Sequence, residues 1–143
     1  MKKYKGTIKY EYYLSENNQR TITSPKEIFN IVKKDFSPMQ EKVWLLILDT
    51  KYHIVKKILI SQGGISNAII DIKVIFKTLI KFENSSAFMI VHNHPSGNLG
   101  QSKEDINVCN RIKNASEMLG YTFLDFIIFS KFGYNSFVDS NIL

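Results

Sequence analysis

Apolar residues follow two patterns along this chain, and together these patterns predict an α/β domain. Two nearly continuous apolar runs, residues 43–49 (VWLLILD) and 87–91 (AFMIV), are typical of central strands buried on both faces. Elsewhere apolar residues recur every three or four positions, which predicts helices over residues 25 to about 36, 67–82 and 103–119. Further strands are predicted at about residues 6–14 and at residues 53–61, 122–129 and 135–138. The resulting order of elements predicts a mixed β-sheet with helices packed against it.

Residues 24–27, with the sequence SPKE, carry the signals of a helix N-terminus. Ser24 is expected to be the N-cap, Pro25 the first helical residue, and Glu27 the residue that completes a capping box. Gly120 is expected to end the third predicted helix. The residues expected to face the sheet are Ile28, Ile31 and Val32 in the first helix, Ile69, Ile72, Ile75, Phe76, Leu79 and Ile80 in the second, and Ile106, Cys109, Ile112 and Leu119 in the third.

Length and composition indicate an ordinary globular protein. The 143 residues, of which 44% are hydrophobic, fit a single domain over residues 1–143 with a core of about residues 24–138. No apolar run approaches the ~20 residues that cross a bilayer, and the first residues lack the apolar stretch of a signal peptide. Cys109 is the only cysteine, so an internal disulfide is excluded. These features predict a cytoplasmic protein without a membrane partner.

The formal net charge is +6, which invites comparison with nucleic-acid-binding proteins. The basic residues nevertheless occur as scattered pairs, such as Lys2-Lys3, Lys33-Lys34 and Lys56-Lys57, rather than as one stripe. A solvated basic surface explains such a distribution. Charge therefore predicts at most a weak association with nucleic acid that does not depend on its sequence.

The segment VHNHPSGN, residues 91–98, carries the strongest chemical signal. Side chains alternate along a strand, so His92 and His94 are expected on one face and Asn93 on the other. Pro95 and Gly97 end the strand and leave the two histidines at an open edge of the sheet. Two imidazoles placed in this way can converge on one metal ion.

Ser102 and Asp105 follow at the start of the next predicted helix and allow two interpretations. A carboxylate at Asp105 can reach back toward the strand end and supply a third ligand. Two histidines and a carboxylate, with the fourth position left to water, are typical of a catalytic zinc site. Ser102 and Asp105 are equally well explained as the N-cap and the third residue of a capped helix. Local evidence leaves both interpretations open.

The whole pattern resembles a known family. His92-x-His94-Pro95-x-Gly97, followed by Ser102-x-x-Asp105, is similar to the JAMM signature of the JAB/MPN+ metalloproteases. The segment VHNHPSGN more specifically resembles the RadC-like branch, and the likeness extends from Ser24 to Phe137. The chain resembles the short, free-standing members that lack a helical region before this domain. The resemblance implies a cytidine-deaminase-like α/β architecture.

The resemblance also implies a role for each site residue. His92, His94 and Asp105 would bind one zinc ion. Glu41, just before the first central strand, would act as general base and then as proton donor, although its position alone is that of an ordinary exposed carboxylate. Ser102 would stabilise the developing oxyanion. The implied reaction is zinc-dependent hydrolysis of an amide or isopeptide bond in a peptide or protein substrate.

Phe126 and Cys109 each bear on an alternative assignment of the site. Phe126 stands where the family commonly has a histidine, so a hydrogen bond from that position is not expected. Cys109 could be imagined as a nucleophile, but its place on an apolar helix stripe predicts an inert thiol. The alternative function is that of a DNA-repair-associated or nucleic-acid-binding RadC-like accessory module with little or no peptidase turnover. An oligomer is compatible with the long apolar strands.

Overall fold

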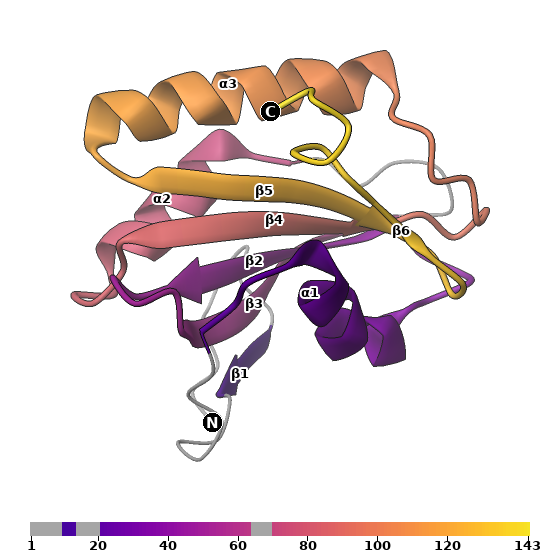
Figure 1. Cartoon of the computed structure of the whole chain (residues 1–143), viewed down its shortest axis with the longest axis horizontal. Coiled ribbons are helices and arrows are strands. Elements are labelled where there is room, and N and C mark those ends of the chain that lie inside the picture. The colour runs from indigo at the N-terminus through magenta and orange to yellow at the C-terminus, as the bar shows by residue number, and fades with distance from the viewer. Residues whose placement is uncertain (1–9, 14–20, 64–69) are drawn as a thin grey trace.

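A mixed β-sheet forms the centre of the molecule and carries helices on both faces (Figure 1). The computed structural model describes residues 10–13, 21–63 and 70–143. Within these residues the strands are β1 (Tyr10–Tyr13), β2 (Lys42–Leu48), β3 (Ile54–Gln62), β4 (Ala87–Asn93), β5 (Thr122–Phe129) and β6 (Tyr134–Ser136). Their order across the sheet is β1-β3-β2-β4-β5-β6. Neighbouring strands are antiparallel except for β4 and β5, which run parallel.

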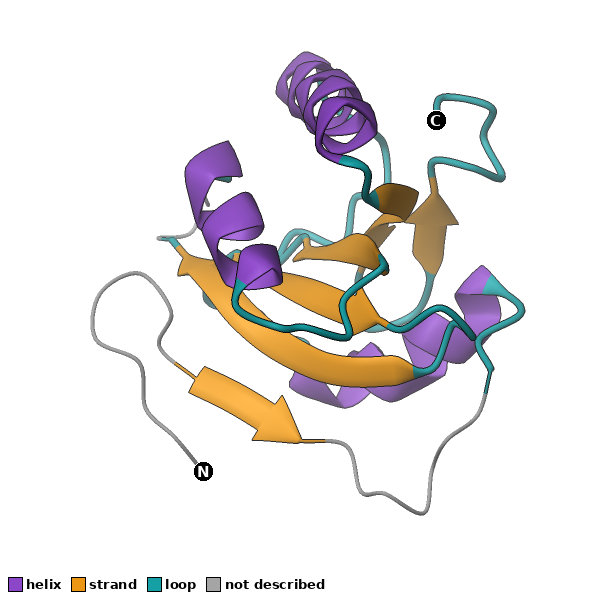
Figure 2. Cartoon of the chain, turned by 90° about the vertical axis from the view of Figure 1, so that its left-hand side faces the viewer, coloured by secondary structure: helices purple, strands orange, loops and turns teal. Residues whose placement is uncertain are grey.

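Three α-helices and one short 3-10 helix complete the described part of the fold. They are α1 (Pro25–Val32), the 3-10 helix η2 (Lys33–Asp35), α2 (Ile72–Ile80) and α3 (Lys103–Leu119). Figure 2 shows helices on both sides of the sheet, with α1 on one face and α2 and α3 on the other. Among the described residues, no helix combines the length and the apolar character that a membrane crossing requires.

Alternation along β2 explains why its sequence is apolar at nearly every position. Val43, Leu45 and Ile47 pack in the core on the α2 and α3 side. Trp44, Leu46 and Leu48 pack in the second core, on the α1 side. A central strand between two helical layers has no solvent-facing side, so both sets must be apolar.

The connection from β4 to β5 places the candidate site. Parallel neighbours need a crossover connection, and α3 supplies it. Because of this crossover, α3 starts near the sheet end where β4 finishes, and residues 94–102 join the two elements. The loop of residues 36–41 leads into β2 at the same end, since β2 is antiparallel to β4. Figure 1 shows both loops at the right-hand end of the sheet.

The predicted order of strands and helices is confirmed. The helix over residues 103–119 and the strand over residues 122–129 agree with α3 and β5. Gly120 ends α3 in the left-handed conformation, with φ 79°. The strand predicted at residues 6–14 overlaps β1, and the remainder of that range lies outside the described residues.

Several predicted boundaries differ from the structure. β4 continues through Asn93 instead of ending at residue 91, because His92 and Asn93 still align with Ile128 and Phe129 of β5. The helix predicted from residue 67 begins at Ile72, since the Asp71 side chain caps it there. Ile69 lies outside the described residues. The last strand ends at Ser136 rather than at residue 138.

Details of the predicted helices also need correction. Glu27 does not complete a capping box; its carboxylate accepts hydrogen bonds from the backbone and hydroxyl of Thr23, while Ser24 caps the helix. Ile80 and Leu119 are 67% and 52% exposed instead of buried. Each is the last residue of its helix, so no further helical turn covers it. The spacing of apolar residues alone therefore predicts too many buried residues at such helix ends.

Two substitutions in α3 test which residues hold it on the sheet. Ile112 is 0% exposed, so Ile112→Ala is expected to lower the free energy of unfolding by about 2–5 kcal/mol. Leu119→Ala is the matched control and is expected to change it by only about 0.5 kcal/mol, since Leu119 is half exposed. Urea denaturation of the two variants measures both values. Equal losses would contradict the burial described above.

Candidate metal centre

His92 lies near the end of β4, His94 directly follows the strand, and their rings are in edge-to-face contact. His92 is on the α2 and α3 side of the sheet, buried, with a relative exposure of 4%. His94 follows the last strand residue, and its backbone N–H donates to the carbonyl of Phe129 at 2.9 Å. The ring centroids are 4.7 Å apart and the rings are nearly perpendicular, at 88°. The two histidines are adjacent as predicted, although His94 lies beyond the last residue of β4.

Asp105 lies against both histidines and also takes part in the cap of α3. The Ser102 hydroxyl accepts a hydrogen bond from the Asp105 N–H at 3.1 Å, and the Asp105 carboxylate accepts one from the Ser102 N–H at 3.0 Å. The Asp105 oxygens lie 3.6 Å from Nδ1 of His92 and 3.8 Å from Nε2 of His94. The two interpretations of Asp105 are therefore compatible, because the capping box holds the carboxylate where both imidazoles are within reach.

Glu41 completes the group from the entry of β2. Its Oε2 lies 3.6 Å from Nε2 of His92. The register between β2 and β4, in which Val43 is opposite His92, brings them together. The ligand atoms of Glu41, His92 and His94 all lie within 4.8 Å of one another, so these residues could hold a metal ion. Ser102 is exposed at the rim, and a chemical role for its hydroxyl stays a prediction.

The two ring nitrogens of His92 indicate that the group has room for a ligand. Both are buried, and neither has a hydrogen-bond partner among the described residues. A buried polar atom without a partner costs about 1–3 kcal/mol. The nearest acidic oxygens, at 3.6 Å, are too far for good hydrogen bonds. An ion would coordinate one of the two ring nitrogens of His92 and leave the other to carry the proton, so the residues present fit a bound metal.

A backbone carbonyl fixes the orientation of His94. Its Nδ1 lies 2.7 Å from the carbonyl oxygen of Asn98. A carbonyl oxygen can only accept, so Nδ1 carries a proton and donates to it, while Nε2 faces Asp105. Metal-binding histidines are commonly held by such a partner on the second ring nitrogen.

The local charges favour an anionic Asp105. Burial by itself would raise the pKa of Asp105, but the neighbouring His92 and the hydrogen bonds from Ser102 outweigh it and lower the pKa to about 2. Burial likewise disfavours protonated His92, but Asp105 and Glu41 raise its pKa above the ordinary value. At neutral pH the group therefore holds an ionised carboxylate in a largely buried position.

Phe126 forms an apolar wall beside His92. It is fully buried, and its ring meets the His92 ring edge to face with centroids 6.5 Å apart. On its other side it packs against Phe137 at 4.7 Å. A phenylalanine offers no hydrogen bond, as expected, and here it restricts the His92 ring by packing.

Asn93 has a structural role that its sequence context did not predict. Its side-chain Nδ2 donates to the carbonyls of Ser37 at 3.1 Å and Gln40 at 2.7 Å, on the face of the sheet opposite the histidines. A polar residue in a strand buried on both faces needs a partner. Its position between two apolar layers was therefore a usable signal, although it could not identify the partner.

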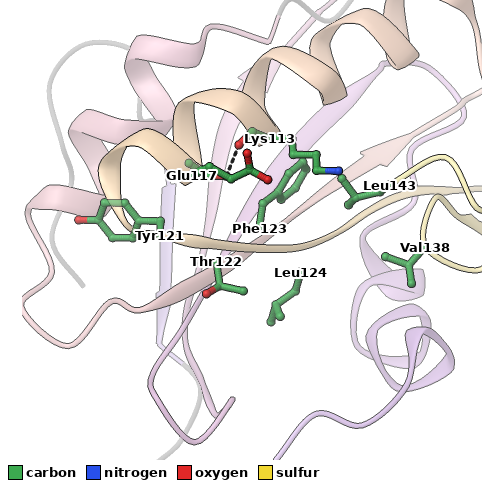
Figure 3. A pocket seen from close by; sticks show the side chains of 9 residues that line it. Lys113, Glu117, Tyr121, Thr122, Phe123, Leu124, Val138 and Leu143 are labelled. Carbon is green, nitrogen blue, oxygen red and sulfur yellow. Dashed lines mark hydrogen bonds between the residues drawn. The ribbon is translucent and has the colours of Figure 1, made fainter.

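A separate cavity lies at the other end of the sheet. It has a volume of about 330 Å³ and lies between the second half of α3, the start of β5 and the C-terminal segment (Figure 3). Lys113 and Glu117 line it from the helix, and Phe123 and Leu124 from the strand. None of its lining residues belongs to the histidine cluster.

Cys109 is excluded as a nucleophile. Its side chain is 0% exposed in the core that α3 forms with the sheet. Burial, together with the nearby Asp125 carboxylate, raises the pKa of its thiol to about 11. The predicted inert packing role is confirmed.

Comparison with known proteins identifies relatives. The family model of the RadC-like JAB domain matches residues 22–142. A UPF0758 protein of Flavobacterium johnsoniae is 36% identical over 125 residues, which cover 86% of this chain and 54% of that protein. A UPF0758 protein of Clostridium tetani is 36% identical over 138 residues, which cover 96% of this chain and 60% of that protein. The chain thus spans little more than half the length of these curated relatives.

The burial of Cys109 leads to a prediction for thiol labelling. With a pKa of about 11, the folded protein holds almost no thiolate at pH 8, so Ellman's reagent is expected to react only after unfolding. One thiol per chain should then appear in guanidinium chloride. Met118→Cys, at a position 87% exposed, is the control and should add one thiol that reacts in the folded protein. Rapid native labelling of the unaltered chain would contradict the prediction.

Proposed function

The chain belongs to the RadC-like JAB domain family, and on this premise we propose that it is a zinc-dependent hydrolase acting on an amide or isopeptide bond of a peptide or protein. The observation that carries the proposal is the convergence of His92, His94, Asp105 and Glu41 at one end of the sheet. His92, His94 and Asp105 lie between 51 and 64 residues after Glu41 in the sequence. The capping box of α3 alone would not explain why two histidines lie beside Asp105.

In this proposal His92, His94 and Asp105 are the zinc ligands. Asp105 lies 3.6 and 3.8 Å from a nitrogen of each imidazole. Ligand atoms ~2.0–2.1 Å from a tetrahedral zinc ion lie roughly 3.4 Å apart, so only small adjustments are needed. Asp105 is also ionised and held by the capping box. Glu41 lies 3.6 Å from the other ring nitrogen of His92, and its ligand atom is within 4.8 Å of those of His92 and His94, so its assignment as the base rather than as a ligand rests on the family resemblance.

The remaining side chains supply the proton transfers. The chemistry that zinc contributes when bound is Lewis acidity, which polarises a carbonyl oxygen and lowers the pKa of water toward ~7. Glu41 accepts the proton that the attacking water gives up and delivers it to the leaving amine. Ser102 donates its hydroxyl proton in a hydrogen bond to the carbonyl oxygen as negative charge develops there.

Metal analysis tests the ligand set. The purified chain is expected to bind one zinc ion, and His94→Ala or Asp105→Ala is expected to abolish stoichiometric binding, since each removes a third of the protein ligands. His53→Ala is the matched control, because His53 pairs with Asp49 away from the cluster. Glu41→Gln should retain zinc if Glu41 is a base and lose it if Glu41 is a ligand. Absence of zinc from the unaltered chain would overturn the proposal.

Turnover provides the second test. Zinc-loaded protein is expected to cleave members of a fluorogenic peptide or isopeptide library, and chelation should stop cleavage. Glu41→Gln is expected to lower kcat by about 100-fold or more at full zinc occupancy, because it removes the proton acceptor. Cleavage that persists unchanged in Glu41→Gln would refute the assigned role of Glu41. Association with nucleic acid and with further copies of the chain stay predictions from the sequence.

A further inference from the structure

Two asparagine side chains hold the two loops that frame the cluster. The first is Asn93, which is 0% exposed and donates through Nδ2 to the carbonyls of Ser37 and Gln40. These carbonyls belong to the loop of residues 36–41, which ends at Glu41. The Gln40 carbonyl, at 2.7 Å, belongs to the residue directly before Glu41.

The second is Asn135 of β6, which acts on the loop of residues 94–102. Its Nδ2 donates to the carbonyl of Leu99 at 2.9 Å and to the side chain of Gln101 at 3.1 Å. The same loop contributes the Asn98 carbonyl that orients His94. Asn135 is itself held, since its Oδ1 accepts a hydrogen bond from Ser140 at 2.7 Å.

These contacts matter because neither loop has regular secondary structure across the segment that is held. A helix or strand fixes its backbone through its own hydrogen bonds, whereas a loop needs side chains or water to satisfy its carbonyls. Each amide fixes two acceptors of one loop at once. The chain therefore places its proton acceptor and its second histidine through hydrogen bonds from outside the loops that carry them.

The position of Asn93 links the two sides of the sheet. Because side chains alternate along β4, His92 points into the cluster while Asn93 points to the opposite face. One short segment thus presents a ligand to the metal centre and anchors the loop that brings in Glu41. Glu41 is fixed a second time by the Gly63 N–H, which donates to its carbonyl at 2.9 Å.

We propose that Asn93 and Asn135 are positioning residues of the metal centre: Asn93 places Glu41, and Asn135 places His94 by holding the loop that carries the Asn98 carbonyl. The inference rests on the proposed function of the site. It assigns a different residue of the centre to each asparagine: Glu41 to Asn93, and His94 to Asn135. A general stabilising role would instead make the two residues interchangeable in their effects.

Hydrogen–deuterium exchange on metal-free protein tests the two contacts separately. Asn93→Leu keeps the size of the side chain but removes the donor, so backbone exchange in residues 36–42 is expected to rise by roughly tenfold, with residues 95–102 unchanged. Asn135→Leu is expected to give the reverse pattern. The variants are therefore controls for each other. A uniform increase in both, or none in either, would overturn the proposal.

Cobalt as a probe metal tests the connection to the ligands. Co²⁺ suits the same imidazole and carboxylate ligands, and its visible absorption reports their arrangement. Asn93→Leu should bind one Co²⁺ with a spectrum like that of Glu41→Gln, because both lose the carboxylate beside the ion. Asn135→Leu should bind Co²⁺ about tenfold more weakly, because His94 is less well oriented. A wild-type spectrum and affinity in both variants would overturn the positioning roles.

Two provisions keep the test decisive. If Asn93→Leu does not fold, Asn93→Ser replaces it, since a serine hydroxyl is too short to reach both carbonyls. Side-chain amide signals of the unaltered protein provide a measurement without a variant: slow solvent exchange at Asn93 supports the contact, and fast exchange contradicts it. Failure of the unaltered chain to bind Co²⁺ or zinc would refute the proposed function. The exchange pattern is measured on metal-free protein, so it tests the contacts of Asn93 and Asn135 independently of that outcome.

Discussion

The structure of the candidate centre depends on the placement of β4 between an antiparallel and a parallel neighbour. Hydrogen bonds to β2 and β5 hold its last residues in extended conformation up to Asn93. Extended backbone sends successive side chains to opposite faces, and this puts His92 over the cluster. The parallel pairing with β5 demands a crossover, and that crossover is α3, which carries Asp105. The antiparallel pairing with β2 brings Glu41 to the same end. A single topological arrangement thus gathers residues from three elements.

The capping box of α3 shows how one set of bonds serves both folding and chemistry. A cap of this kind stabilises a helix by about 1 kcal/mol. In this chain it also prevents the Asp105 carboxylate from turning into solvent and keeps its oxygens toward His92 and His94. The carboxylate is therefore preorganised, so less conformational entropy would be lost if a cation bound to it. Stability of the helix start and affinity for an ion are expected to be coupled for this reason.

Local patterns were sufficient for the elements and for part of the centre, but not for contacts between distant segments. Alternation placed His92 and His94 on one face, and the helix start placed Asp105 near them. The sequence around Glu41 shows only an acidic residue before a strand. The proximity of Glu41 to His92 comes from the register between β2 and β4, which a local pattern does not contain. The role proposed for Glu41 comes from the resemblance to a family. The contacts of Asn93 with residues 37–40 and of Asn135 with residues 99–101 have the same long-range origin. Helix ends were misjudged at Ile80 and Leu119 because periodicity cannot show where the covering layer stops.

Phe126 leaves the imidazole of His92 with a purely apolar neighbour on one side. A hydrogen-bonding side chain at this position, next to the buried imidazole of His92, could compete for one of its ring nitrogens. The phenyl ring packs against the imidazole edge to face and offers no such bond. Both nitrogens of His92 are then left to face Glu41 on one side and Asp105 on the other. Phe126 therefore keeps the ring in place without a hydrogen bond to it, so the electrostatics of this histidine depend on Glu41 and Asp105.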